Sequence, residues 1–215
     1  MNTIKQSVAI GVRGIRHLIH HPITMVFTLF NPLVWFFIYG QLFKGVAQIP
    51  GFPTDNYTLF VLPGVLGIAV LSVTLFNANN VVIIGLPFTG GLAAGWIGVI
   101  LVYILSIMFG FSMTCLGLSM SLASNTAWEF FGMVNFIQLP LFFMSSALFP
   151  QDFMPKWLSV VAQFNPLSHY VNAVRSLYID GLDWSVIGLA AGVLFLFNIL
   201  LFFLVKTIYR KVVAV

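Results

Sequence analysis

Long apolar stretches, separated by short polar or Pro/Gly-rich segments, dominate the pattern along the chain. Five of these stretches contain no Asp, Glu, Lys, Arg or His, and they cover residues 23–43, 57–76, 96–122, 130–149 and 185–205. Each reaches the length of about 20 residues that crosses about 30 Å of hydrocarbon. Because lipid offers the backbone no hydrogen-bond partners, each stretch is predicted to be a membrane-spanning helix.

The first 21 residues show a different periodicity. At 100° per residue, one face carries aliphatic side chains and the opposite face carries polar and basic ones, Arg13 and Arg16 among them. This pattern predicts an amphipathic helix in the headgroup region of the membrane. Two interpretations stay open, a simple interfacial anchor or an elbow helix that also contacts a cytoplasmic partner through Arg13 and Arg16.

Residues 150–184, between the last two stretches, are too many for a simple turn. Pro155 to Val161 has the pattern of a short amphipathic helix, Asn165-Pro166 interrupts it, and helical spacing resumes from Ser168 to Arg175. We expect two short helices that dip partly back into the outer leaflet. They form either a surface cap or a gate over a translocation route, and the candidate gate residues are Phe149, Pro150, Asn165, Pro166 and Arg175.

Composition narrows the class of protein. Of 215 residues, 60% are apolar and 7% are charged, against about 25% charged in soluble domains, and the mean hydropathy is +1.04. These values exclude a soluble enzyme and indicate a single integral membrane domain. The lone Cys115 excludes an intrachain disulfide, and the net charge of +4 is not a nucleic-acid signal because the basic residues flank apolar stretches. No nucleotide-binding, catalytic or metal-binding motif is visible.

The charges predict the orientation. Three basic residues precede the first stretch and three follow the last, so both chain ends are placed in the cytoplasm. An even number of crossings is then required, and six crossings give outside segments with three basic and four acidic residues, and inside segments with six basic residues and Glu129.

The sixth crossing is incomplete. The only further apolar stretch is residues 81–88, which as a helix is about 12 Å long at about 1.5 Å per residue. We expect that residues are missing between Asn80 and Val81, with part of the third span and a charged cytoplasmic loop. The alternative is a true deletion, with residues 81–88 as a half-crossing inside the bundle.

Polar residues at the span ends and within spans are further candidates. Glu129 follows Ser124, Asn125 and Thr126 in the cytoplasmic turn before the stretch 130–149. It favours the helix dipole there, with Ser124 or Asn125 as the cap, or it contacts a cytoplasmic partner subunit. Asn31-Pro32 and Pro63-Gly64 lie within spans, as simple kinks or as hinges. Asn135, Gln138 and Asn198 are expected to form hydrogen bonds between helices, or else to line a substrate path.

Several short motifs, in order, resemble the transmembrane permease of the type-2 ABC exporter family. They are Leu62-Pro63-Gly64, the segment 145–150 (SSALFP), Asn165-Pro166-Leu167 and Ala173-Val174-Arg175. The resemblance covers nearly the whole chain. It implies an all-α bundle of six transmembrane helices over residues 22–206, an N-terminal elbow helix, and two permease copies with two ATPase subunits. The drug, polyketide and lipid exporter branch is the more similar one. The family's charged loop after the second span is absent here.

The sequence therefore predicts a multi-pass permease subunit in a bacterial inner membrane, which moves a hydrophobic or amphipathic molecule outward. It is predicted to be no enzyme itself, because ATP and Mg²⁺ would bind the separate ATPase. A secondary carrier is disfavoured because the spans hold no ionisable residues. The alternative function is a membrane pore or scaffold without ATP coupling.

Overall fold

The computed structural model describes residues 41–55, 60–67 and 93–213, together with Val34, Ile38 and Tyr57. The regular elements within these residues are all helical. Two of them, α5 (Gly95–Ala123) and α9 (Trp184–Val213), are long and apolar enough to cross a membrane. They confirm the helices predicted from stretches 96–122 and 185–205. Tyr57 and residues 60–67 are also helical, within the predicted second span.

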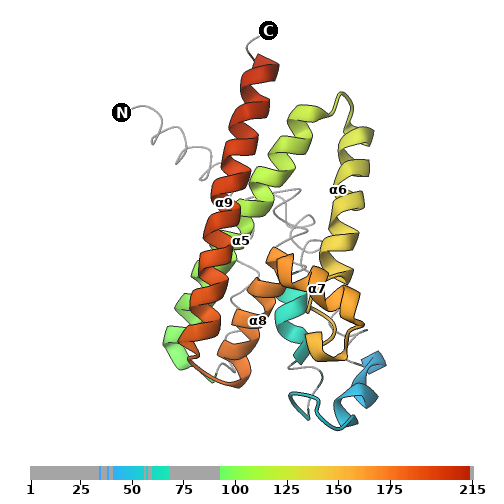
Figure 1. Cartoon of the computed structure of the whole chain (residues 1–215), viewed down its shortest axis with the longest axis vertical. Coiled ribbons are helices and arrows are strands. Elements are labelled where there is room, and N and C mark those ends of the chain that lie inside the picture. Colours follow the sequence, from blue (N-terminus) through green and yellow to red (C-terminus); the bar gives the residue numbers. More distant parts are fainter. Residues whose placement is uncertain are drawn as a thin grey trace, which may run out of the picture.

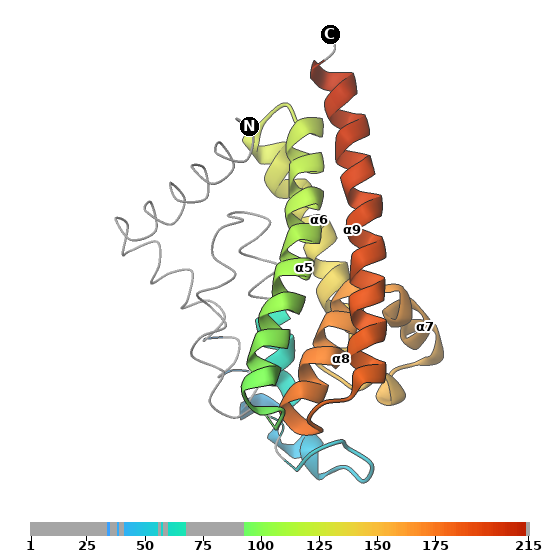
Figure 2. The same ribbon diagram turned by 90° about the vertical axis from the view of Figure 1, so that its left-hand side faces the viewer.

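The long helices α5 and α9 lie side by side, as both views show (Figures 1 and 2). Polar groups join them near the middle. The amide nitrogen of Asn198 donates to the Met108 carbonyl oxygen at 3.0 Å, and its oxygen accepts from the Ser112 hydroxyl. The predicted interhelical role of Asn198 is confirmed. Asn135 is a correction, because it is exposed and bonds within its own helix, to the Phe131 carbonyl oxygen.

Helix α6 (Ala127–Phe143) follows α5 after a short turn and returns along the molecule (Figure 1). It ends six residues before the end of the predicted stretch, Phe149, so that expectation is wrong for residues 144–149. Side chains from the following segment take the last carbonyl oxygens of α6, as described below. Only Val134 and Phe142 of α6 are buried.

The segment after α6 folds into short helices at one end of the molecule. They are η3 (Gln151–Phe153), α7 (Lys156–Phe164) and α8 (Pro166–Ile179). The predicted helix–break–helix pattern at Asn165-Pro166 is confirmed, because Asn165 ends α7 and caps α8. After α8, Gly181 adopts a φ of +94°, the left-handed conformation that glycine tolerates at a helix end.

The segments predicted to lie on the same side of the membrane gather at the same end of the molecule. The 3₁₀ helix η1 (Lys44–Gln48) and the segment with α7 and α8 lie at one end, and the turn between α5 and α6 and the end of α9 lie at the other (Figure 1). The predicted N-terminal elbow helix, Asn31 and Pro32, and the junction of Asn80 with Val81 lie outside the described residues.

Candidate functional site

A buried arginine joins three segments of the chain. Arg175 is 8% exposed; its Nε donates to the Phe60 carbonyl oxygen at 3.2 Å and its Nη2 to the Ser146 carbonyl oxygen at 2.8 Å. The guanidinium carbon lies 3.7 Å from the centre of the Phe60 ring, a cation–π contact. Helix α8 is thereby fixed to residues 60–67 and to the turn after α6. We call residues 60–67, 144–150 and α8 the α8 cluster.

Arg175 remains charged although it is buried. Burial lowers the pKa of Arg175 to about 9, partly opposed by the Tyr57 phenol, so the guanidinium stays charged at neutral pH. A buried charge is tolerated only with hydrogen-bond partners, and carbonyl oxygens supply them here. The expectation that Arg175 satisfies carbonyl groups is confirmed.

A second polar group, Asn172, lies one turn before Arg175 on α8. Its Oδ1 accepts from the Ser146 hydroxyl at 2.7 Å and from Arg175 Nη1 at 3.2 Å. The Ser146 backbone N–H in turn donates to the Ser168 hydroxyl at 3.2 Å. The turn after α6 is therefore held by three polar side chains of α8.

Asn165 occupies the break between α7 and α8 and serves both α6 and α8. Its Oδ1 accepts from the Leu167 N–H at 3.0 Å and so caps α8. Its Nδ2 donates to the carbonyl oxygens of Leu141 at 2.8 Å and Met144 at 3.0 Å. The last turn of α6 thus has its acceptors satisfied from the start of α8, which explains why the apolar segment 144–149 does not continue the helix.

The other candidate gate and hinge residues lie in or beside the α8 cluster. Phe149 packs edge-on against Phe43, with 5.5 Å between ring centres. Pro63 and Gly64 are buried in the helical residues 60–67. A Cβ on Gly64 would collide with the Ala147 carbonyl oxygen, so this glycine permits a close backbone approach. Hydrogen bonds from Asn165 to Met144 and from Arg175 to Ser146 place Asn165, Pro166 and Arg175 beside the turn that ends at Phe149 and Pro150.

An open apolar groove lies between α6 and α7. Its volume is about 400 Å³. Phe136 of α6 and Phe164 of α7 lie on its walls and are 78% and 81% exposed. The rest of its lining is Ile137, Pro140, Leu141, Met144, Val161, Asn165 and Pro166. The groove suits an apolar occupant, because the side chain of Asn165 is the one polar lining side chain and its amide is already bonded.

The turn between α5 and α6 lies at the opposite end from the α8 cluster (Figure 1). Thr126, rather than Ser124 or Asn125, is the N-cap of α6: its hydroxyl accepts from the Glu129 N–H at 3.2 Å. The Glu129 carboxylate accepts from the Asn125 N–H at 2.8 Å. The expectation of Glu129 in the first helical turn is confirmed, and the cap expected at Ser124 or Asn125 is wrong. Arg13 and Arg16 lie outside the described residues.

Three residues of these sites were missed in the sequence. Ser146 and Asn172 form the polar network of the α8 cluster, and the spacing of Asn172 three residues before Arg175 was the available signal. Trp128 was the third: it is 86% exposed beside the capped turn, where a large aromatic side chain at a span end is a signal for an interfacial position.

Comparison with known proteins decides the family. Residues 66–179, more than half of the chain, match the family model described as ABC-2 type transporter. The chain belongs to the ABC-2 type transporter family. The matched range contains α5, α6, α7 and α8, and with them the groove and most of the α8 cluster. The family resemblance seen in the sequence motifs is confirmed, and the chain is a membrane permease subunit of an ABC transporter.

Three permeases illustrate how similar this chain is to its ABC-2 relatives. "Putative transport permease ycf38" of Cyanophora paradoxa is 25% identical, over 73% of this chain and 68% of its own. "Daunorubicin resistance ABC transporter permease protein DrrB1" of Streptomyces coeruleorubidus is 22% identical, over 74% of this chain and 69% of its own. "Probable multidrug ABC transporter permease YbhR" of Escherichia coli K12 is 26% identical, over 63% of this chain and 35% of its own.

The two longest of these alignments contain gaps in this chain. The alignment with the Cyanophora protein runs over 198 residues but takes up 73% of the 215-residue chain, which is about 157 residues. The alignment with the Streptomyces protein runs over 199 residues and takes up 74%, about 159 residues. In each case about 40 positions of the relative have no counterpart in this chain.

Proposed function

We propose that this permease subunit moves a hydrophobic or amphipathic molecule outward, from the cytoplasm or the inner leaflet, in an ATP-driven exporter. The observation that carries the substrate class is the groove between α6 and α7, which has apolar walls and two exposed phenylalanines. An ion or a free sugar would find no polar partners there. A drug-like or lipid-like molecule would be retained, because leaving the groove for water would expose its apolar surface.

The names of two relatives support the same substrate class. One relative is named for daunorubicin resistance and another for multidrug transport. For this chain we infer a drug, a lipid or a glycolipid-like molecule as the exported substrate. The location we infer is a bacterial inner membrane, with both chain ends in the cytoplasm, as the basic residues at the two ends favour.

The assembly we propose contains two copies of this chain and two ATPase subunits. One chain of this size encloses little room, and a second copy related by symmetry creates a central path. Helix α6 exposes most of its surface, which is the property expected of a helix that faces a partner copy or the path. Cross-linking in native membranes should give a dimer, and a product that stays monomeric would contradict the assembly.

Coupling to the ATPase is proposed at the cytoplasmic end. Ser124, Asn125, Thr126 and Glu129 form the capped turn there, and two of its hydrogen bonds fix the start of α6. Arg13 and Arg16 of the predicted elbow helix are the basic candidates for contact with the ATPase.

We further propose that the roughly 40 positions of the relatives that have no counterpart in this chain belong between Asn80 and Val81, where a charged loop and part of the third span are expected. Sequencing the gene across the codons of Asn80 and Val81 tests this proposal. If the two codons are adjacent, the alternative of a true deletion holds.

The α8 cluster is proposed to gate the outer end of the path, rather than only to cap the bundle. Replacement of Asn165-Pro166 by Ala-Ala removes the bonds from Asn165 to Leu141 and Met144 that join α6 to α8. Transport should fall while membrane insertion is unchanged. A variant that inserts and transports like the wild type would show that the segment is only a cap.

Purification from the native host tests the function as a whole. The chain should co-purify with a nucleotide-binding ATPase, and vesicles containing the complex should move a fluorescent hydrophobic drug only when ATP is supplied. Drug movement that is independent of ATP would favour the alternative, a pore without ATP coupling. A chain that purifies alone and moves nothing would favour a scaffold.

A further inference from the structure

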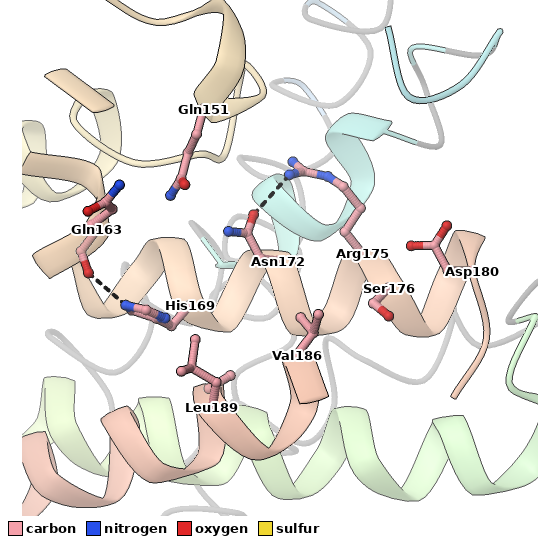
Figure 3. A pocket seen from close by; sticks show the side chains of 10 residues that line it. Gln151, Gln163, His169, Asn172, Arg175, Ser176, Asp180, Val186 and Leu189 are labelled. Carbon is pink, nitrogen blue, oxygen red and sulfur yellow. Dashed lines mark hydrogen bonds between the residues drawn. The ribbon is translucent and has the colours of Figure 1, made fainter. Parts of the chain in front are cut away.

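A cavity with many polar lining residues lies between α8 and α9, separate from the groove. Its volume is about 450 Å³, within the range of roughly 300–1,000 Å³ for small-molecule sites. One wall comes from α9 and is apolar, and the other carries polar side chains of η3, α7 and α8 (Figure 3). The polar lining residues are Gln151, Gln163, His169, Asn172, Arg175, Ser176 and Asp180.

The orientation of the Asn172 side chain is fixed by its neighbours. Its Oδ1 accepts from two donors, the Ser146 hydroxyl and Arg175 Nη1. Because both partners donate, the oxygen must face them, and the amide nitrogen must face the other way. Figure 3 shows this nitrogen directed toward the side of the cavity where Gln151 and Gln163 lie. No acceptor within the described part of the chain meets it, so two N–H donors are available there.

A buried hydroxyl in the same wall is also unsatisfied. Ser176 is 4% exposed, and its hydroxyl oxygen has no hydrogen-bond partner among the described residues. Buried polar groups are rarely left in this state. Ser176 lies one helical turn after Asn172 and lines the same cavity. The wall therefore offers the two N–H donors of Asn172 beside the positive charge of Arg175, whose partners in the described segments are carbonyl and amide oxygens and not carboxylates.

The opposite wall selects an amphiphile. Leu189 is exposed on α9 and Val186 is half-buried, and both line the cavity. Because α9 has the length and apolarity of a membrane span, an alkyl chain that leaves the cavity would lie along α9 in the lipid. Excess N–H donors near a guanidinium favour a phosphate group.

We propose that the cavity between α8 and α9 binds the phosphodiester headgroup of a membrane lipid, whose acyl chains lie along α9. Asn172 donates to the phosphate oxygens beside the Arg175 charge, and the amides of Gln151 and Gln163 flank the headgroup. The acidic residue of the lining, Asp180, lies at the other side of the cavity, at the end of α8 (Figure 3). This inference requires that α9 crosses the membrane, and it does not rest on ATP-driven export or on the exported substrate.

Native mass spectrometry of the purified protein in detergent, titrated with dioleoyl phosphatidylglycerol, tests the proposal. The wild-type protein should retain this lipid. It should bind dioleoylglycerol, which lacks the phosphate, about tenfold more weakly. Added inorganic phosphate should not displace the phospholipid. Asn172→Asp keeps an oxygen for Ser146 and Arg175 but replaces the two N–H donors by a negative oxygen. It should weaken phospholipid binding about tenfold while the melting temperature is unchanged or higher.

Gln48→Glu is the matched control, since it makes the same change of charge at an exposed residue of η1 that does not line the cavity. It should bind phospholipid like the wild type. Equal binding by Asn172→Asp and the wild type, or equal binding of dioleoylglycerol, would overturn the proposal. Displacement of the lipid by inorganic phosphate would overturn the lipid as the occupant. If Asn172→Asp fails to fold, the double variant Gln151→Leu with Gln163→Leu is measured in its place. Weaker phospholipid binding by this variant supports the proposal, and binding equal to the wild type overturns it.

Discussion

The α8 cluster and helix α6 have opposite surroundings. In α8, side chains on most faces are buried, and the polar residues Arg175, Asn172 and Ser168 all bond to other segments. In α6, only Val134 and Phe142 are buried, and Asn135 bonds to its own helix. The cluster has the contacts of a rigid block, whereas α6 has open faces that lipid, a second copy or a substrate can cover. We infer that the cluster moves as one rigid gate and that α6 changes its surroundings during transport.

Removal of the charge at Arg175 should break the cluster most strongly. Arg175→Met leaves the carbonyl oxygens of Phe60 and Ser146 without their donor in a buried site, at roughly 1–3 kcal/mol for each unsatisfied group. The protein should lose about 3 kcal/mol or more of unfolding free energy, seen as a lower melting temperature in detergent. Arg210→Met is the control at an exposed position and should melt like the wild type. Equal melting of the two variants would disprove the structural role of Arg175.

The close approach of Gly64 to the backbone should be the next most sensitive point. In Gly64→Ala the new Cβ would meet the Ala147 carbonyl oxygen, which is backbone and cannot rotate away. We expect a loss of about 2–3 kcal/mol in unfolding free energy from overpacking. Gly132→Ala on α6 is the matched substitution, because the methyl group added there would have nothing within 4 Å of it. It should be neutral or stabilising, and a loss at Gly132 similar to that at Gly64 would contradict the contrast.

The polar contact between α5 and α9 should contribute less. Asn198→Leu removes the bonds to Met108 and Ser112, and interhelical hydrogen bonds in membranes contribute about 0.6 kcal/mol on average. The melting temperature should fall slightly, by the equivalent of about 1 kcal/mol. Asn135→Leu, at an exposed position on α6, should not lower it. A larger loss for Asn135 than for Asn198 would reverse our assignment of the two residues.

The smallest effect on stability is expected in the groove, together with a clear effect on transport. Phe136→Ala changes an exposed side chain, so the unfolding free energy should stay within about 0.5 kcal/mol of the wild type. Transport of a hydrophobic drug in vesicles should nonetheless change, because the groove wall loses its aromatic ring. Phe202→Ala at an exposed position of α9 controls for loss of any lipid-facing ring. Unchanged transport in Phe136→Ala would remove the groove from the path.

The sequence allowed the long helices to be predicted but not the tertiary contacts that end them. Stretches 96–122 and 185–205 predicted α5 and α9 because uninterrupted apolar runs of that length have one stable form in lipid. Asn165-Pro166 predicted the break before α8, since proline favours the first turn of a helix and asparagine its cap. The end of α6 was not predictable, because residues 144–149 are mostly apolar and the side chains that take the carbonyl oxygens there, those of Tyr57, Asn165 and Arg175, are distant in sequence.

The site could be predicted in its residues more than in its bonds. Arg175 and Asn165 were named as candidates, but the partners Ser146 and Asn172 were not, since 26 residues separate them and no periodicity connects them. At the α5–α6 turn, Ser124, Asn125 and Thr126 are all good capping residues, so pattern alone could not select Thr126.

Thiol labelling in the complex with the ATPase tests the proposed role of the open face of α6 most directly. Cys115 is buried and is the one native cysteine of the chain, so Phe136→Cys on α6 and Leu196→Cys on α9 introduce single reactive positions. With ATP, the labelling rate at position 136 should change several-fold while the rate at position 196 stays constant. Equal rates with and without ATP at both positions would contradict the claim that the open face of α6 takes part in transport.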